Sequence, residues 1–383
     1  MLVQRSIQRL HLVFRHVKMR PSYCTTVAAA EDDVLFNTVG STGVVTLNRP
    51  KALNALDLSM IRKIHPRLVT WESDEKMKLV IMNSTGEKAF CAGGDIRAVT
   101  EAGKVGGKLS KDFFFEEYIL NNKIGTYKLP YVAIIDGITM GGGVGLSVHG
   151  MFRVATERTV FAMPETGIGL FPDVGGGFFL PRLPGKLGIY LALTGFRLKG
   201  RDVHKAGVAT HFVQSNKIPE LEEALTSLKE PEKLDVESVL SAFQDQSEDI
   251  PDNDFILQPH LDQISSLFGG ESVEEIFENL KSDGSEWALE QLATLEKMSP
   301  TSMKVTLRQL IEGESRTLQE CLNVEYRISQ RCCEDKDFYE GVRAVLVDRD
   351  QSPRWDPPTL AGVTQEKVDW YFSPLPAERE LIL

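Results

Sequence analysis

The chain has 383 residues, of which 42% are hydrophobic and 25% are charged, and its formal net charge is −11. These proportions are those of a globular protein, and the length allows one large domain with an appendage or two domains. The acidic balance argues against a nucleic-acid-binding protein, because such proteins contact phosphates through clustered Lys and Arg.

Residues 1–30 differ from the rest of the chain because they contain no Asp or Glu. Their basic residues alternate with apolar ones, as on an amphipathic helix, and hydroxyl residues follow. The basic residues are Arg5, Arg9, Arg15, Lys18 and Arg20. This composition predicts a mitochondrial transit peptide over residues 1–30, with a disordered basic tail as the alternative.

Neither a membrane span nor a disulfide framework is expected. The most apolar stretch, Tyr131–Val148, is interrupted by Asp136 and by five glycines. The five cysteines have spacings that match no zinc motif, and a reducing compartment such as the mitochondrial matrix fits them.

Short β-rich runs alternate with helical patterns from about residue 40 to residue 215. A helix capped by Asp57 is expected to run to about Thr70, and a second helix is expected over residues 110–124. The expected strands are Gly43–Leu47, Lys78–Met82, Tyr131–Ile135, Phe152–Ala155 and Val160–Ala162. Strands separated by helices predict βαβ-type units, and therefore an α/β core over residues 31–243.

The second half of the chain is acidic and helical in pattern. Gln244–Asp254 is polar, contains one proline, and is the best candidate for a linker. Helical periodicity then returns over residues 272–281, 286–298, 301–313 and 316–334. We therefore expect a C-terminal helical region over residues 255–358. An irregular tail over residues 359–383 follows prolines at 353, 357 and 358.

Two glycine-rich loops could bring backbone N–H groups close to a ligand. Ala89–Arg97 reads AFCAGGDIR and follows the second expected strand, and Asp136–Gly145 reads DGITMGGGVG and follows the third. The second loop is expected to open a short helix, Val144–His149, whose first N–H groups lack intrahelical partners and can bind an anion. The alternatives are a simple turn for the first loop and tight helix–sheet packing for the second.

A third loop carries two carboxylates in apolar surroundings. Phe161–Gly177 reads FAMPETGIGLFPDVGGG and contains Glu165 and Asp173. Burial raises the pKa of a carboxyl, so these acids are candidates for general acid–base work, although a helix cap or a turn acid is the alternative. Together the three loops supply what attack on a carbonyl through an oxyanion requires.

These motifs resemble the crotonase superfamily, also called the enoyl-CoA hydratase/isomerase family. The resemblance begins at NRPKALNALD (Asn48–Asp57) and continues through CAGGD, GITMGGGVG and MPETGIGLFPDVGGG. It is fullest for the subfamily of 3-hydroxyisobutyryl-CoA hydrolases, which EEYILNNKIG, ALTGFRLKGRD, SPTSMKVTLRQL and DFYEGVRAVLVDRDQSPRW also resemble. It covers roughly residues 34–358 and implies a core of repeated ββα turns under a C-terminal helical region.

The resemblance also implies roles for five residues. The N–H groups of Gly94 and Gly142 would form an oxyanion hole for the thioester carbonyl. Glu165 matches the family's catalytic glutamate, and Asp173 matches the aspartate of the hydrolases. Glu117 matches an acid close to the substrate, with a helix-surface charge as the alternative.

The activity implied is hydrolysis of 3-hydroxyisobutyryl-CoA in valine breakdown, with 3-hydroxypropionyl-CoA as a further substrate and with no metal or redox cofactor. Glu165 would activate water or form an anhydride. Asp173 would bind the substrate hydroxyl or protonate the departing CoA. Enoyl-CoA hydratases carry a glutamate where this chain has Gly145. Hydratase or isomerase activity is therefore the weaker alternative, as is a non-catalytic component of mitochondrial ribosomes.

The remaining expectations concern partners and side chains near the loops. A homo-oligomer is compatible with the resemblance, and the predicted location is the mitochondrial matrix. Lys51, Arg97 and Arg343 are either contacts for CoA phosphates or ordinary surface charges. His149 is interpreted as a partner of the dipole at its helix C-terminus rather than as a base. Cys91 is interpreted as a small buried filler rather than as a nucleophile.

Overall fold

The computed structural model describes residues 32–247 and 254–383. The predicted transit peptide over residues 1–30 lies outside the described residues, as does most of the predicted linker. Among the described residues, no helix combines the length and the apolar character needed to cross a bilayer.

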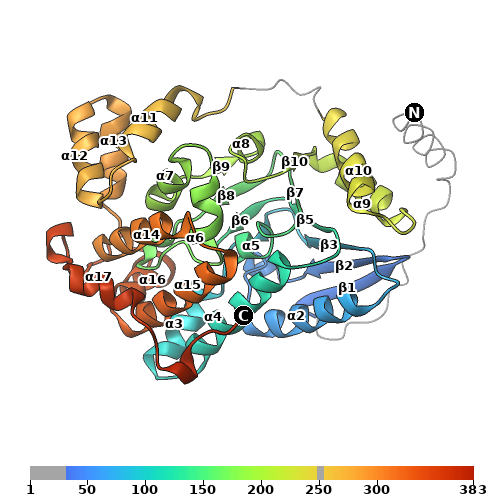
Figure 1. The fold of residues 1–383 in the computed structure, drawn as a ribbon, viewed down its shortest axis with the longest axis horizontal. Helices are drawn as coiled ribbons and strands as arrows, with labels where there is room; N and C mark the ends of the chain where they lie inside the picture. Colours follow the sequence, from blue (N-terminus) through green and yellow to red (C-terminus); the bar gives the residue numbers. More distant parts are fainter. Residues whose placement is uncertain (1–31, 248–253) are drawn as a thin grey trace.

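The strands form two sheets at the centre of the fold (Figure 1). The 6-stranded sheet has the order β1-β2-β3-β5-β7-β10, and the 4-stranded sheet has the order β4-β6-β8-β9. The strands are β1 (Val34–Val39), β2 (Thr42–Leu47), β3 (Leu79–Ser84), β4 (Ala89–Cys91), β5 (Tyr131–Ile135), β6 (Ile138–Met140), β7 (Phe152–Ala155), β8 (Val160–Ala162), β9 (Leu198–Lys199) and β10 (His211–Phe212). The five strands expected from the sequence are thus confirmed as β2, β3, β5, β7 and β8.

Consecutive strands are divided between the two sheets. β3, β5 and β7 lie in the larger sheet, and the strand that follows each of them lies in the smaller one. Within each of these two sets the neighbouring strands are parallel. Each pair of strands forms one repeat, and the loop after its second strand leaves the smaller sheet at the same end in every repeat. The motif loops are therefore brought together.

Helices follow these strand pairs, and the expected α/β class is confirmed. Asp57 caps α2 by accepting a hydrogen bond from the Met60 N–H, and the buried face of α2 includes Ile61, Ile64 and Leu68. The helices of this half are α2 (Leu58–Ser73), α3 (Ile96–Lys104), α4 (Leu109–Gly125), α5 (Gly142–Gly145), α6 (Gly176–Phe179), α7 (Leu187–Thr194), α8 (Arg201–Lys205), α9 (Ile218–Thr226) and α10 (Lys233–Asp245).

The C-terminal half is helical, as expected. Its helices are α11 (Leu261–Leu267), α12 (Val273–Asp283), α13 (Glu286–Leu295), α14 (Pro300–Gly313), α15 (Leu318–Glu334), α16 (Asp337–Val342) and α17 (Gln365–Phe372). Helix α15 packs against α4, and both α14 and α15 pack against α6 (Figure 1). The expectation of an irregular tail after residue 358 is wrong for α17. The Thr364 side chain caps this helix, and Val368, Tyr371 and Phe372 are buried.

Two other boundaries differ from expectation. The short helix expected over residues 144–149 is α5, which begins earlier, at Gly142, and has only four residues. Residues in a glycine run carry no helical periodicity, so the sequence could not place its first turn. The candidate linker begins inside α10, which continues to Asp245.

A close backbone contact joins α14 to α6, the short helix that follows the loop of Asp173. A Cβ on Gly313 would lie 2.0 Å from the carbonyl oxygen of Gly177. Gly313→Ala should therefore lower the free energy of unfolding by about 1–3 kcal/mol, because backbone must move apart. The measurement is chemical unfolding of both proteins.

Gly167→Ala is the matched control, because its added Cβ would meet only the Met298 sulfur, at 3.4 Å. Equal stability of the two variants would contradict the close approach of α14 to α6.

Candidate active site

The first glycine loop is held against the chain that precedes α2. Leu56 forms an isolated parallel bridge with Gly94 through two backbone hydrogen bonds: the Leu56 N–H donates to Gly93, and the Asp95 N–H donates to Leu56. This bridge does not use the Gly94 N–H. The bridge therefore leaves that donor free, as the oxyanion role implied by the resemblance would require.

The second glycine loop lies directly beside the first. Gly142 is the first residue of α5, so its N–H has no intrahelical acceptor. A Cβ placed on Gly142 would lie 3.3 Å from the Gly94 nitrogen. The two donors that the resemblance implied are thus brought together, and any side chain on Gly142 would occupy the space between them.

Glu117 comes to the same place from α4. It is 1% exposed, and its Oε1 would lie 2.6 Å from a Cβ on Gly142. The same oxygen is buried and makes no hydrogen bond within the described residues. The alternative of a helix-surface charge is therefore wrong for Glu117.

Glu165 begins the 3-10 helix η2 (Glu165–Ile168), and Asp173 follows eight residues later. The exposed fractions of the two residues are 5% and 4%. The Glu165 Oε1 would lie 3.2 Å from a Cβ on Gly141, next to Gly142. The Tyr118 hydroxyl donates a 2.9 Å hydrogen bond to the Asp173 carboxylate. Both acids are therefore buried, and neither caps a helix through its side chain.

The three carboxyl groups perturb one another. Burial raises the pKa of Glu117 well above its ordinary value, and the charges of Asp173 and Glu165 raise it further. Burial, followed by the charge of Asp173, also raises the pKa of Glu165. Burial raises the pKa of Asp173 to about 7, although the Tyr118 hydrogen bond lowers it. A carboxyl whose pKa is about 7, as for Asp173, can hold or release a proton near neutral pH and is suited to general acid–base catalysis.

The loop that carries Asp173 has a strained backbone. Val174 has φ +50°, a conformation that β-branched residues rarely adopt. Its carbonyl accepts a 2.6 Å hydrogen bond from the Nε2 of His149, and the Pro172 carbonyl accepts one from the Gln309 amide at 2.8 Å. Hydrogen bonds on both sides of Asp173 thus hold the loop in this conformation.

Glu325 of α15 holds the other end of the loop. Its carboxylate accepts hydrogen bonds from the N–H groups of Gly175, at 2.7 Å, and Gly177, at 2.9 Å. The Gln309 amide donates to the same carboxylate at 3.0 Å. A side chain from the C-terminal helices therefore fixes the position of Asp173, which agrees with the expectation that this region covers the site.

His149 and Cys91 are both buried beside the loops, and the structure bears on the interpretation of each. Burial lowers the pKa of His149 to about 4, so the ring is neutral at neutral pH and cannot interact with the helix dipole as a cation. That interpretation is wrong, because His149 lies beyond the end of α5 and braces the Asp173 loop. Burial raises the pKa of the Cys91 thiol to about 12, which agrees with its interpretation as a buried filler.

The contacts of several residues with the Asp173 loop were not predicted from the sequence. Tyr118, His149, Gln309 and Glu325 all contact the Asp173 loop or its carboxylate. Tyr118 gave a signal, because it follows Glu117 on a helix that the sequence predicts, and His149 was singled out but misinterpreted. The contacts of Gln309 and Glu325 depend on how the C-terminal helices pack, which no local motif records.

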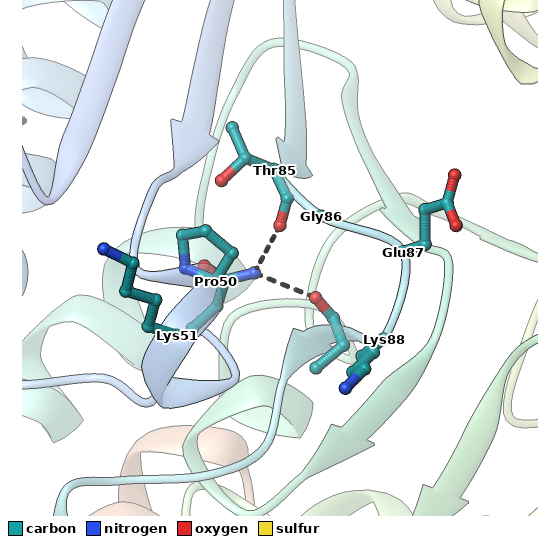
Figure 2. Close-up of a pocket in the computed structure, with 8 residues that line it drawn as sticks. Pro50, Lys51, Thr85, Gly86, Glu87 and Lys88 are labelled. Atoms are coloured by element: carbon teal, nitrogen blue, oxygen red, sulfur yellow. Dashed lines mark hydrogen bonds between the residues drawn. The ribbon is translucent and has the colours of Figure 1, made fainter.

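Asn54 anchors the chain beside the first glycine loop, at the pocket drawn in Figure 2. Its amide nitrogen donates to the carbonyls of Thr85 and Ala89, both at 2.9 Å, and these bonds are the dashed lines in Figure 2. Lys51 and Lys88 both line this pocket. The loop that leads to Gly94 is thus fixed to the segment before α2.

Lys51, Arg97 and Arg343, the candidate contacts for CoA phosphates, differ in their ion pairs. Arg97 pairs with Glu101 at 2.9 Å. Arg343 pairs with Glu340, Asp348 and Asp350 at 2.6–2.8 Å. Three carboxylates around one guanidinium make Arg343 a structural cation, whereas Lys51 lines an open pocket beside the first loop.

Glu325 allows a test of this electrostatic arrangement. Burial raises its pKa from 4.5 to about 8, so the folded protein retains a proton that the unfolded chain releases. The stability that this proton provides is fully present below about pH 4.5 and is lost as the pH rises towards about 8. Wild type should therefore lose on the order of a few kcal/mol relative to Glu325→Gln across that range.

The measurement is urea unfolding of both proteins at several pH values. Glu290→Gln, at an exposed position on α13, is the matched control. A stability difference between wild type and Glu325→Gln that does not change with pH would contradict the raised pKa.

Comparisons with known proteins agree on one family. The family model for Enoyl-CoA hydratase/isomerase matches residues 42–372. The chain is 61% identical to "3-hydroxyisobutyryl-CoA hydrolase, mitochondrial" of Danio rerio over 100% of both chains. It is 57% identical to the protein of the same name from Homo sapiens, over 97% of this chain and 95% of that one.

Two solved structures are similar over nearly the whole fold. A carnitinyl-CoA dehydratase from Mycobacterium thermoresistibile has a TM-score of 0.84 and 39% identity, covering 92% of this chain and 99% of that chain. An enoyl-CoA hydratase from Rhodobacter sphaeroides has a TM-score of 0.81 and 36% identity, covering 92% and 100%. The repeated strand pairs, the glycine loops and these matches together show that the chain has the crotonase fold and belongs to the enoyl-CoA hydratase/isomerase family.

Proposed function

We propose that this protein hydrolyses the thioester of 3-hydroxyisobutyryl-CoA to 3-hydroxyisobutyrate and free CoA, in valine catabolism. The observation that carries the proposal is the placement of two buried acids at the second glycine loop: Glu165 lies against Gly141, and Val174, the residue after Asp173, lies against Gly145. The relatives that are 57–61% identical to the chain are named as hydrolases of this thioester.

The thioester carbonyl oxygen would lie between the N–H groups of Gly94 and Gly142. These donors are part of the backbone, so they need no reorganisation as negative charge develops on that oxygen. In other enzymes, losing one such donor costs about 100- to 1000-fold in rate. The 3.3 Å between the Gly94 nitrogen and a Cβ position on Gly142 supports their cooperation.

Glu165 would take a proton from the attacking water, while Asp173 would give a proton to the sulfur of the departing CoA. The water oxygen first bonds to the acyl carbon, which places negative charge on the carbonyl oxygen. The carbonyl then re-forms as the carbon–sulfur bond breaks. A pKa of about 7 suits Asp173 to this role, because it can hold the proton at neutral pH. Glu117, whose oxygen lies against Gly142, would contact the substrate beside the carbonyl.

The residue at the position where hydratases carry a catalytic glutamate disfavours hydration of a double bond, because it is Gly145. A Cβ on Gly145 would lie 2.6 Å from the amide nitrogen of Asn121 and 2.7 Å from the Cβ of Val174. A carboxylate side chain therefore has no room there unless both neighbours move. This favours hydrolysis over the activities named for the two solved structures.

The protein is mitochondrial, as its relatives' names indicate. We place it in the matrix, where a reducing environment suits the four free cysteines of the described residues. The proposed chemistry uses only protein side chains and water, so it requires neither a metal nor a redox cofactor. Acceptance of 3-hydroxypropionyl-CoA and assembly into a homo-oligomer remain predictions.

The first test is the loss of thiol release in variants of the two acids. Glu165→Gln should lower kcat by about 100- to 10,000-fold, because it removes the general base. Asp173→Asn should also lower kcat, because an amide cannot donate an acidic proton to the thiolate. The measurement is release of free CoA from (S)-3-hydroxyisobutyryl-CoA, followed with a thiol reagent.

Glu290→Gln is the control for this assay and should keep wild-type activity. The proposed function fails if wild type releases no thiol, and the assigned roles fail if Glu165→Gln is as fast as wild type.

A second test concerns the pH dependence of the reaction. The Tyr118 hydrogen bond lowers the pKa of Asp173, so Tyr118→Phe should raise it. If Asp173 acts in its protonated form, the loss of activity at alkaline pH should begin at a higher pH in Tyr118→Phe. The measurement is kcat/KM between pH 5 and 10, with Tyr127→Phe as the control outside the site. An unchanged alkaline limb would contradict the role of Asp173 as the acid.

A further inference from the structure

Asn121 is a buried amide in the site that the proposed mechanism does not use. It lies on α4, one helical turn after Glu117, and is 0% exposed. Neither its oxygen nor its nitrogen has a hydrogen-bond partner among the described residues. A buried amide without partners is unfavourable unless a ligand or water supplies the missing bonds.

The amide lies against both the second glycine loop and the loop that carries Asp173. Its nitrogen would be 2.6 Å from a Cβ on Gly145, and that same Cβ position is 2.7 Å from Val174, the residue after Asp173. On the preceding turn of α4, Glu117 faces Gly142 in the same way. Asn121 therefore occupies the space that the missing side chain of Gly145 leaves beside the substrate site.

The hydrogen-bonding groups of the Asn121 amide indicate which kind of ligand group would bind to it. An amide offers an N–H donor and a carbonyl acceptor, and both are unused here. A hydroxyl group can accept from the first and donate to the second. A carboxylate could only accept, and a cluster of three buried acids disfavours a second anion nearby.

We propose that Asn121 is a specificity-determining residue whose amide binds the 3-hydroxyl group of the acyl chain. This inference rests on the proposed hydrolase activity and assigns the substrate hydroxyl to Asn121, which leaves Asp173 to protonate the departing thiolate. A site with a buried amide discriminates against an acyl group without the hydroxyl, because the amide would then be left unpaired.

The test compares (S)-3-hydroxyisobutyryl-CoA with isobutyryl-CoA in wild type and Asn121→Leu. The substitution should lower kcat/KM for the hydroxylated substrate by about 10- to 100-fold. It should leave kcat/KM for isobutyryl-CoA within a few fold, so that the ratio between the two substrates falls. Asn121→Ala is measured alongside, because leucine must fit against Val174. Asn279→Leu, at a half-buried amide of α12 that donates to the Leu267 carbonyl, is the matched control and should keep the wild-type ratio.

Equal losses on both substrates would overturn the inference, because they would assign Asn121 to the attacking water or to general packing. An unchanged ratio at wild-type rates would also overturn it. Absence of thiol release from wild type would instead be a failure of the proposed function, and the two failures are therefore distinguishable.

A crystal structure of wild type with 3-hydroxyisobutyrate and CoA tests the contact without any substitution. The hydroxyl oxygen is expected within hydrogen-bond distance of the Asn121 amide. A bound hydroxyl that contacts other groups while Asn121 binds only water would overturn the inference.

Discussion

The site depends on one constraint: the carboxyl groups of Glu117, Glu165 and Asp173 are buried in one cluster. No cation is among the causes of their pKa shifts. Removing carboxylates from water is costly, so such a cluster keeps protons that exposed acids would release. The arrangement therefore costs stability and supplies proton donors and acceptors near neutral pH. Because the charge of Asp173 raises the pKa of both Glu117 and Glu165, the protonation states of these groups are linked.

The C-terminal helices help to hold one acid of this cluster in place. Asp173 lies in a loop whose next residue, Val174, has a strained backbone, and such a loop keeps its shape only if neighbours hold it. His149 comes from the core, whereas Gln309 and Glu325 come from α14 and α15. The helical region thus excludes water from the acids and also positions one of them.

Much of the fold could be predicted from the sequence, because strand runs and helical periodicity are local signals. Glu165, Asp173 and the two glycine loops were likewise visible as motifs, and the resemblance added Glu117. The short helix α5 was misplaced because glycines carry no periodicity. Helix α17 was missed because nearby prolines dominated the pattern.

The contacts of Gln309 and Glu325 could not be predicted, since they arise from the packing of helices far apart in the chain. The position of Asn121 arises from the packing of α4 against two loops. His149 was misinterpreted for the same reason: its neutral state follows from burial, which the sequence does not state. Sequence motifs thus locate the candidate catalytic groups, whereas the structure shows which residues hold them in place.

The central claim is that the two glycine N–H groups and the buried acids act on one thioester carbonyl. The most direct measurement is a crystal structure of Glu165→Gln with bound (S)-3-hydroxyisobutyryl-CoA. The account predicts that the thioester oxygen accepts hydrogen bonds from both Gly94 and Gly142, with residue 165 facing the thioester carbon. A thioester oxygen that contacts neither glycine nitrogen would contradict it.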